Sequence, residues 1–209
     1  MNKKIEILRE SAQNKPNSNS GKFGVNPVVF TIWLLIIASV MLFAAFASAY
    51  TVHRADGIRN EAWLQFELPS WFWISALIAA LSSFFIQKAY NAAKKDDIQL
   101  VPGMVFFTLI MGILFGISQF LGWRAMHRVG LFVSNQEAAE ISASFVYVIS
   151  FIHLLHIVIG MVLLGVTLYR SLKLKVHKKN LVFINISTTY WHFLGILWVA
   201  MLLFLHFSR

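Results

Sequence analysis

Five long apolar runs dominate the chain, and short polar segments separate each run from the next. The runs cover about 27–50, 69–90, 103–123, 143–169 and 183–207. Each supplies the roughly 20 residues that an α-helix needs to cross a hydrocarbon core of about 30 Å. The pattern predicts an all-α membrane protein, with residues 27–209 forming a bundle of five transmembrane helices.

Residues 1–26 have a different character, with many Asn, Ser and Lys residues around Pro16 and little apolar content to bury. Such a composition predicts a polar, flexible tail. It also differs from a cleavable signal peptide, which needs an apolar core that ends in a small-residue site. We therefore expect the spans themselves to direct insertion into the membrane.

Loop charges predict the orientation, because Lys and Arg close to the spans are retained on the cytoplasmic side. The tail, the second-to-third loop and the fourth-to-fifth loop hold 13 of the 18 Lys and Arg residues, including every lysine. The other side carries only Arg54, Arg59, Arg124, Arg128 and Arg209. The amino terminus is therefore expected in the cytoplasm and the carboxyl terminus on the outer side.

The net charge of +9 does not indicate a nucleic-acid partner. Binding to nucleic acid needs basic residues on one continuous face of a soluble module, whereas here they lie between apolar spans. Cysteine is absent, which excludes disulfides and thiolate ligation of metals.

Four tryptophans lie near the expected outer ends of spans: Trp63, Trp71, Trp73 and Trp123. Such positions are typical of the membrane interface.

Candidate chemistry within the spans is limited to histidines. No span has Asp or Glu away from its ends, although membrane proton relays usually need such an acid. His153, His156 and His192 lie inside spans, with His206 near an outer end. His153 and His156 are three residues apart and so project from about the same helix face.

Two hypotheses follow for these histidines. His156 and His192 lie at similar expected depths and could ligate haem b in a small membrane cytochrome. Alternatively, neutral imidazoles could bond across helices to Tyr190, Ser150 or backbone carbonyls and fix the packing. We favour the second.

Small and polar residues in the spans are typical of helix contacts in lipid. Gly112 and Gly116 form a Gly-x-x-x-Gly pair, for which we expect intramolecular packing. A channel or transporter is disfavoured, because the five spans show neither a convincing internal repeat nor an acidic coordination site.

Specific strings in all five spans resemble the heme-copper oxidase subunit III family, known best as cytochrome c oxidase subunit III. The resemblance covers nearly everything after the tail and looks like the shorter five-helix bacterial form. The strings, in order, are 38–43 with Ala49, Tyr50 and Arg54; 69–75 with Ser82 and Ser83; 112–119 with Trp123; His153, His156 and Gly160; and 190–193 with Trp198.

Two departures from the family pattern both remove a carboxylate. Ser39 stands where many relatives carry a glutamate, and Gly195 stands where they carry an aspartate. In relatives the glutamate is associated with carboxyl-reagent reactivity and with arguments about proton uptake. We expect no such role here.

The resemblance implies a non-redox accessory subunit of a heme-copper terminal oxidase, in the inner membrane of a bacterium. It implies no haem or copper in this chain; these cofactors are expected in the catalytic subunit I, with which this chain and other oxidase subunits would assemble. It further implies bound structural phospholipid and support for proton-coupled oxygen reduction. An accessory subunit of a nitric oxide reductase or quinol oxidase is an alternative. The candidate structural or lipid-contact residues are His153, His156, Tyr190, Trp191, His192, Trp198, Trp73 and Arg54.

Overall fold

The computed structural model describes residues 27–59, 67–130, 138–173, 176 and 181–208, and these form five α-helices. The helices are α2 (Pro27–Arg59), α3 (Ser70–Lys94), α4 (Leu100–Arg128), α5 (Ala138–Leu172) and α6 (Val182–Phe207). Each is long and apolar enough to cross a membrane. The prediction of five such helices is confirmed, whereas the expected tail of residues 1–26 lies outside the described residues.

Most helices extend beyond the apolar runs that the sequence delimits. The first predicted span ends at Tyr50, for example, while α2 continues to Arg59. A helix satisfies its own backbone hydrogen bonds, so it continues into the polar interface until a local signal ends it. At the end of α4 that signal is Gly130, whose positive φ of 83° closes the last turn. Its N–H donates to the carbonyl of His127 at 3.2 Å.

A short turn joins α3 to α4. Asp96 adopts a positive φ of 63°, which Asp tolerates better than most residues do. The next residue, Asp97, accepts a hydrogen bond from the backbone N–H of Leu100 through Oδ1 at 3.4 Å. The two helices therefore run antiparallel and pack against each other along their length.

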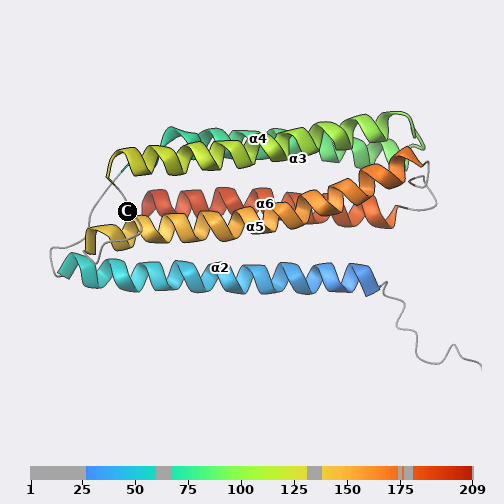
Figure 1. Ribbon diagram of the computed structural model, residues 1–209. Coiled ribbons are helices and arrows are strands. Elements are labelled where there is room, and N and C mark those ends of the chain that lie inside the picture. Colours follow the sequence, from blue (N-terminus) through green and yellow to red (C-terminus); the bar gives the residue numbers. More distant parts are fainter. Residues whose placement is uncertain (1–26, 60–66, 131–137, 174–175, 177–180, 209) are drawn as a thin grey trace, which may run out of the picture.

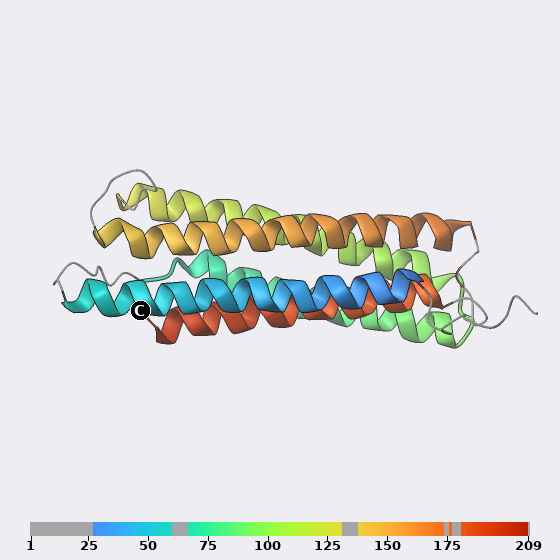
Figure 2. The same cartoon turned by 90° about the horizontal axis from the view of Figure 1, so that it is seen from below.

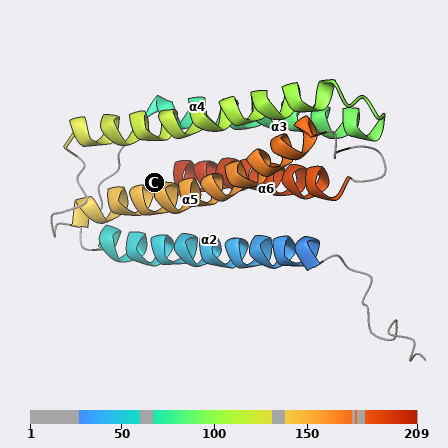
Figure 3. The ribbon, with the colours of Figure 1, turned by 45° about the vertical axis from the view of Figure 1, so that its right-hand side comes forward.

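The helices are stacked in three layers (Figure 1). The middle layer consists of α5 and α6, with α3 and α4 on one face and α2 on the other. Seen from the side of α2, that helix runs along the α5–α6 layer, roughly parallel to both helices (Figure 2). In Figure 3, the carboxyl end of α5 leans toward α3 and α4. The core therefore lies between the middle layer and the α3–α4 pair. Helix α2 packs on the opposite face of the middle layer.

Candidate functional site in the core of the bundle

The core is built around two tryptophans of α6 that lie seven residues apart. Trp191 donates a hydrogen bond from Nε1 to Oγ of Ser82 at 2.9 Å. Trp198 donates from Nε1 to Oγ of Ser75 at 2.8 Å. The two serines are also seven residues apart, on α3, which runs antiparallel to α6. The two bonds therefore form successive rungs that fix the register of α6 against α3.

Trp191 acts as the central wedge between helices. Its ring lies against Gly112 of α4, where an added Cβ would come within 2.9 Å of the ring, and against Gly160 of α5, where the distance would be 3.2 Å. Both glycines therefore provide the space that the indole occupies. For Gly112, this contact is the packing within the chain that the sequence predicted.

Trp198 lies in a second layer of aromatic and polar side chains. Its indole stacks on the imidazole of His153 at 5.1 Å between ring centroids. The edge of Phe115 from α4 approaches it at 5.6 Å. Gln119, also on α4, donates to the same Ser75 oxygen at 2.9 Å. Four helices thus converge on one buried position, because α3, α4 and α5 all contact the side chain that α6 supplies.

His153 is 1% exposed and lies between aromatic rings. Besides Trp198, it contacts Phe43 of α2 and Phe115 edge-on, with ring centroids 6.1 Å and 5.7 Å away. Neither of its ring nitrogens has a hydrogen-bond partner among the described residues. The hydrogen bond that the sequence predicted for His153 is therefore absent within that part of the chain, because its neighbours are mainly aromatic rings. Ser150 instead accepts from Nε1 of Trp123 at 2.8 Å.

His156 and Tyr190 connect α5 to its neighbours. Nδ1 of His156 lies 2.8 Å from the carbonyl oxygen of Ile152, one turn earlier on the same helix. The imidazole also packs on Phe43 at 5.5 Å. Tyr190 of α6 donates its phenolic hydrogen to the backbone carbonyl of His156 at 3.5 Å. The His156 imidazole therefore bonds a carbonyl of its own helix and not one across helices, as the sequence had suggested, whereas Tyr190 makes the bond between helices.

His192 faces the opposite side of the middle layer. Its Nε2 lies 3.0 Å from Oε1 of Gln87 on α3. His156 packs on Phe43 of α2, whereas His192 pairs with Gln87 of α3, so the two imidazoles have partners on different helices. These two helices lie on opposite sides of the middle layer (Figure 1). The haem hypothesis, which needs both imidazoles on one iron, therefore lacks geometric support. The described residues contain no group of three or more His, Cys, Asp or Glu side chains that could hold a metal ion.

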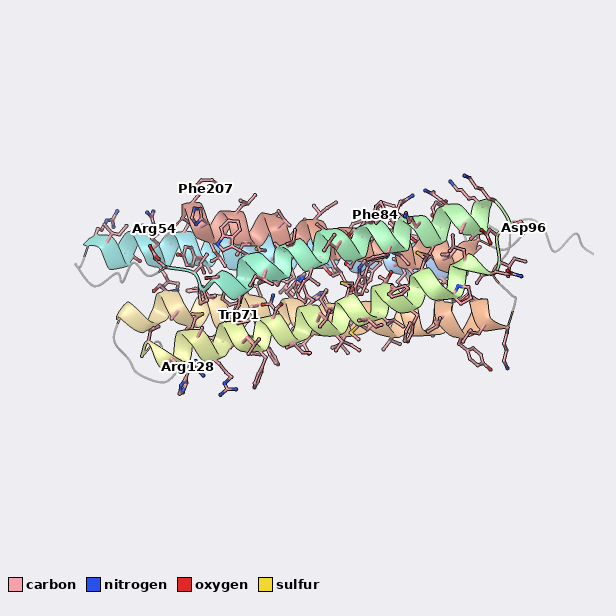
Figure 4. All side chains as sticks on the ribbon, turned by 90° about the horizontal axis from the view of Figure 1, so that it is seen from above. Arg54, Trp71, Phe84, Asp96, Arg128 and Phe207 are labelled. Carbon is pink, nitrogen blue, oxygen red and sulfur yellow. The ribbon has the colours of Figure 1, made fainter. Side chains whose placement is uncertain are left out.

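Trp73 and Arg54 lie apart from this core. Trp73 of α3 is 42% exposed, and its ring meets the imidazole of His206 edge-on at 5.4 Å. Arg54 is partly exposed near the carboxyl end of α2. Figure 4 places Arg54 toward the same end of the bundle as Arg128 and Phe207, and Asp96 at the opposite end. These two candidates therefore belong to the surface at one end of the helices.

The two positions that depart from the family pattern have different surroundings. Ser39 is buried, and its hydroxyl donates to the carbonyl of Leu35 on its own helix at 2.7 Å. At Gly195 an added Cβ would lie 3.4 Å from Oγ of Ser83, which is an ordinary contact. The structure can therefore accommodate at least a small side chain at Gly195.

The sequence alone did not single out Phe43 and Phe115, whose rings are buried in the core, or Gln87, the partly buried partner of His192. Phenylalanine is common in every span, so no local pattern separates a core ring from one that faces lipid. Phe43 and Phe30 illustrate this point, since they are 0% and 56% exposed on the same helix. A usable signal did exist in the matched seven-residue spacings of Ser75 with Ser82 and of Trp191 with Trp198.

Two grooves open on the outside of the bundle. One, of about 550 Å³, lies between α3 and α6. Its lining consists of Ala79, Ala80, Ser83, His192, Gly195, Ile196, Val199, Ala200 and Leu203. The other, of about 420 Å³, lies between α4 and α5 and is lined by Trp123, Tyr147, Val148, Phe151 and Ile152. Both linings are mainly apolar, which suits a hydrocarbon occupant.

Comparison with known proteins connects this helix bundle to a family. The chain is 28% identical over 207 residues to a probable cytochrome c oxidase subunit 3 of Nocardia farcinica, covering 96% of this chain and 93% of the relative. It is 24% identical over 205 residues, with the same coverage, to cytochrome c oxidase subunit 3 of Corynebacterium diphtheriae. No protein-family model matches the chain.

A more distant relative is a subunit of a different oxidase. The cytochrome bo(3) ubiquinol oxidase subunit 3 of Buchnera aphidicola is 21% identical over 184 residues, covering 88% of this chain and 95% of the relative. Matches to proteins named as subunit 3 thus extend over most of this chain's length, in agreement with the ordered strings in its five helices. Over most of its length, this multi-pass membrane protein is therefore similar to the cytochrome c oxidase subunit III proteins of several bacteria.

Proposed function

We propose that this chain is the non-redox accessory subunit III of a heme-copper terminal oxidase in the inner membrane of a bacterium. The observation that carries the proposal is the similarity to proteins named cytochrome c oxidase subunit 3 over 96% of the chain. In this proposal, haem and copper reside in the catalytic subunit I. This chain stabilises that subunit and thereby supports proton-coupled oxygen reduction in aerobic respiration.

The chemistry of the core supports a structural role over a redox role. Electron transfer through a haem in this chain would need two imidazoles on one iron, but His156 and His192 have different partners on opposite faces of the middle layer. Proton transfer through the membrane usually uses an acid at mid-depth, and no span of this chain carries one. The buried tryptophans instead join helices rigidly, as a scaffold requires.

Purification of the native complex tests the assignment. We expect an affinity tag on this chain to retain a haem- and copper-containing catalytic subunit, together with other oxidase subunits, from membranes in mild detergent. The isolated chain should be colourless. A Soret band that stays with the isolated chain and is lost in His192→Ala would instead support the small cytochrome b.

We also propose that structural phospholipid occupies the two outer grooves. Their volumes of about 550 and 420 Å³ and their mainly apolar linings suit acyl chains. Trp123 and Tyr147 lie in the second groove, and such rings commonly sit at the level of lipid headgroups.

Ala200→Trp should fill part of the α3–α6 groove and lower the phospholipid retained per complex, as measured by lipid extraction and mass spectrometry. Unchanged lipid content would contradict occupancy of that groove.

A quinol-oxidising complex is the second candidate. It is favoured by the similarity to the Buchnera aphidicola ubiquinol oxidase subunit 3. The electron donor separates the two candidates, so the purified complex should be assayed with reduced cytochrome c and with a ubiquinol analogue. Oxygen uptake with only the quinol would replace the first candidate by the second. An accessory role in a nitric oxide reductase predicts consumption of nitric oxide in place of oxygen.

A further inference from the structure

A small, partly enclosed cavity lies in the middle of the bundle, where α3, α4, α5 and α6 meet. Its volume is about 10 Å³, which is close to the space that one water molecule requires. Its lining consists of Ala79, Ser82, Phe115, His153, Ile157, Trp191, Leu194 and Gly195. Most of these side chains are apolar, so the polar members, Ser82 and His153, determine what the cavity can bind.

His153 provides a hydrogen-bonding group that protein partners do not satisfy. A neutral imidazole carries one donor and one acceptor nitrogen. Both nitrogens are buried, and the described part of the chain offers neither of them a partner. Unpaired polar groups are unfavourable in a protein interior and more so at membrane depth, where bulk water is absent. Because His153 lines the cavity, a molecule inside it can reach the ring.

Ser82 supplies the second partner. Its hydroxyl donates to the carbonyl of Ala79 at 2.8 Å and accepts from Nε1 of Trp191 at 2.9 Å. A hydroxyl oxygen has two acceptor lone pairs, so one remains for a further donor. A water molecule can donate one hydrogen to this oxygen. Its other groups can pair with His153 in either tautomer, since water both donates and accepts.

We propose that one water molecule is a fixed part of this core and bridges His153 to Ser82. The bridge connects α5 to the hydrogen bond between Ser82 of α3 and Trp191 of α6, so one molecule joins three helices. It also gives the imidazole a hydrogen-bonding partner at a position where its other neighbours are mainly aromatic rings. Buried waters of this kind fill small polar cavities and satisfy groups that the chain leaves unpaired.

The cavity has a thin wall on one side. Ala79 and Gly195 line both the cavity and the large α3–α6 groove, so these two small residues separate the water site from the outside of the bundle. Ala80 lines the groove but is not among the residues around the cavity. The pair Ala79 and Ala80 therefore offers a matched test of whether the cavity itself matters.

Water-edited solid-state NMR of the full-length chain, with ¹⁵N-labelled histidine in lipid bilayers, tests the proposal. The His153 imidazole should receive magnetisation from water although it is 1% exposed. His153→Phe identifies its resonance among the 7 histidines, and sequential backbone assignment serves if that variant does not fold. The transfer should be lost in Ala79→Val, whose added methyl groups fill the cavity, and retained in Ala80→Val.

Absence of water-to-imidazole transfer at His153 in the unmodified chain would overturn the proposal, whichever variants fold. Full transfer in Ala79→Val would also overturn it, because the water would then lie elsewhere. Loss of transfer in both Ala79→Val and Ala80→Val would have the same consequence, since a bound water in the cavity should not respond to Ala80.

Discussion

Gly112 and Gly116 lie one helical turn apart in α4, but they meet different neighbours. An added Cβ at Gly112 would come within 2.9 Å of the Trp191 ring, which is held by its bond to Ser82. An added Cβ at Gly116 would lie 3.8 Å from Leu154, an ordinary contact distance. Both glycines precede an isoleucine in the same apolar helix, but only Gly112 would place a Cβ against a ring that is held in place.

We therefore expect Gly112→Ala to destabilise the protein and Gly116→Ala to leave it unchanged or slightly more stable. Overpacking a rigid site costs roughly 1–3 kcal/mol, which exceeds the gain of about 1 kcal/mol from replacing a helical glycine by alanine. At Gly116 only the gain applies. Unfolding in a detergent titration with SDS measures both variants, and equal stability of the two would refute the wedge role of Trp191.

Among the five helices, α2 makes the fewest contacts with the rest of the bundle. Phe43, at 0% exposure, packs on the imidazoles of His153 and His156. Tyr50, a turn or two further along, packs on Phe145 of α5 and Phe204 of α6, each at 5.6 Å between ring centroids. Much of the remaining surface of α2 is exposed, as at Met41, which is 68% exposed.

Phe43→Ala should therefore loosen α2 from the middle layer. In a soluble core this truncation costs about 3–5 kcal/mol. We expect a smaller loss here, because lipid is as apolar as the side chain and only the packing contribution is lost. Hydrogen exchange of the α2 amides should become faster, while α3 and α4 keep their protection. Met41→Ala is the matched control and should change neither; equal exchange in the two variants would show that Phe43 does not hold α2.

At the scale of the whole molecule, the two ends of the bundle differ in charge. The end with the α3–α4 turn carries cations over aromatic rings: Lys94 lies 4.4 Å from the Tyr90 centroid, and Arg170 lies 3.6 Å from that of Phe183. At the opposite end, Arg59 pairs with Asp56 at 3.8 Å on an exposed surface. Surface pairs of this kind add little stability, but the excess of lysine at the first end predicts that it faces the cytoplasm.

Single cysteines test this orientation directly, since the chain has none of its own. In intact cells a membrane-impermeant maleimide should label Arg128→Cys at the outer end. Lys95→Cys, in the turn between α3 and α4, should react only after the membrane is permeabilised. The reverse pattern would mean that the loop charges do not set the topology of this chain.

The number, type and approximate length of the helices can be predicted from the sequence alone. These properties follow from the continuous apolar runs, because a helix is the structure that satisfies backbone hydrogen bonds within a single chain segment in lipid. The sequence also singled out Trp191, Trp198, Tyr190 and the histidines, since polar or amphipathic groups within apolar runs are few. The helix ends were less predictable, because helices continue past the apolar boundary into the interface.

Which of these residues contact one another depends on the tertiary structure. Periodicity places Trp191 on one face of α6, but it does not state which helix faces it, so its contacts with Ser82, Gly112 and Gly160 could not be derived. For the same reason His153 and His156 share a contact with Phe43 but differ in their other partners, which are Trp198 and the Ile152 carbonyl. His192 pairs with Gln87 on the other side of the layer. Within lipid, the hydrophobic effect does not select which apolar face of a helix becomes buried. Close packing and individual hydrogen bonds set the arrangement instead, and both depend on residues distant in the chain.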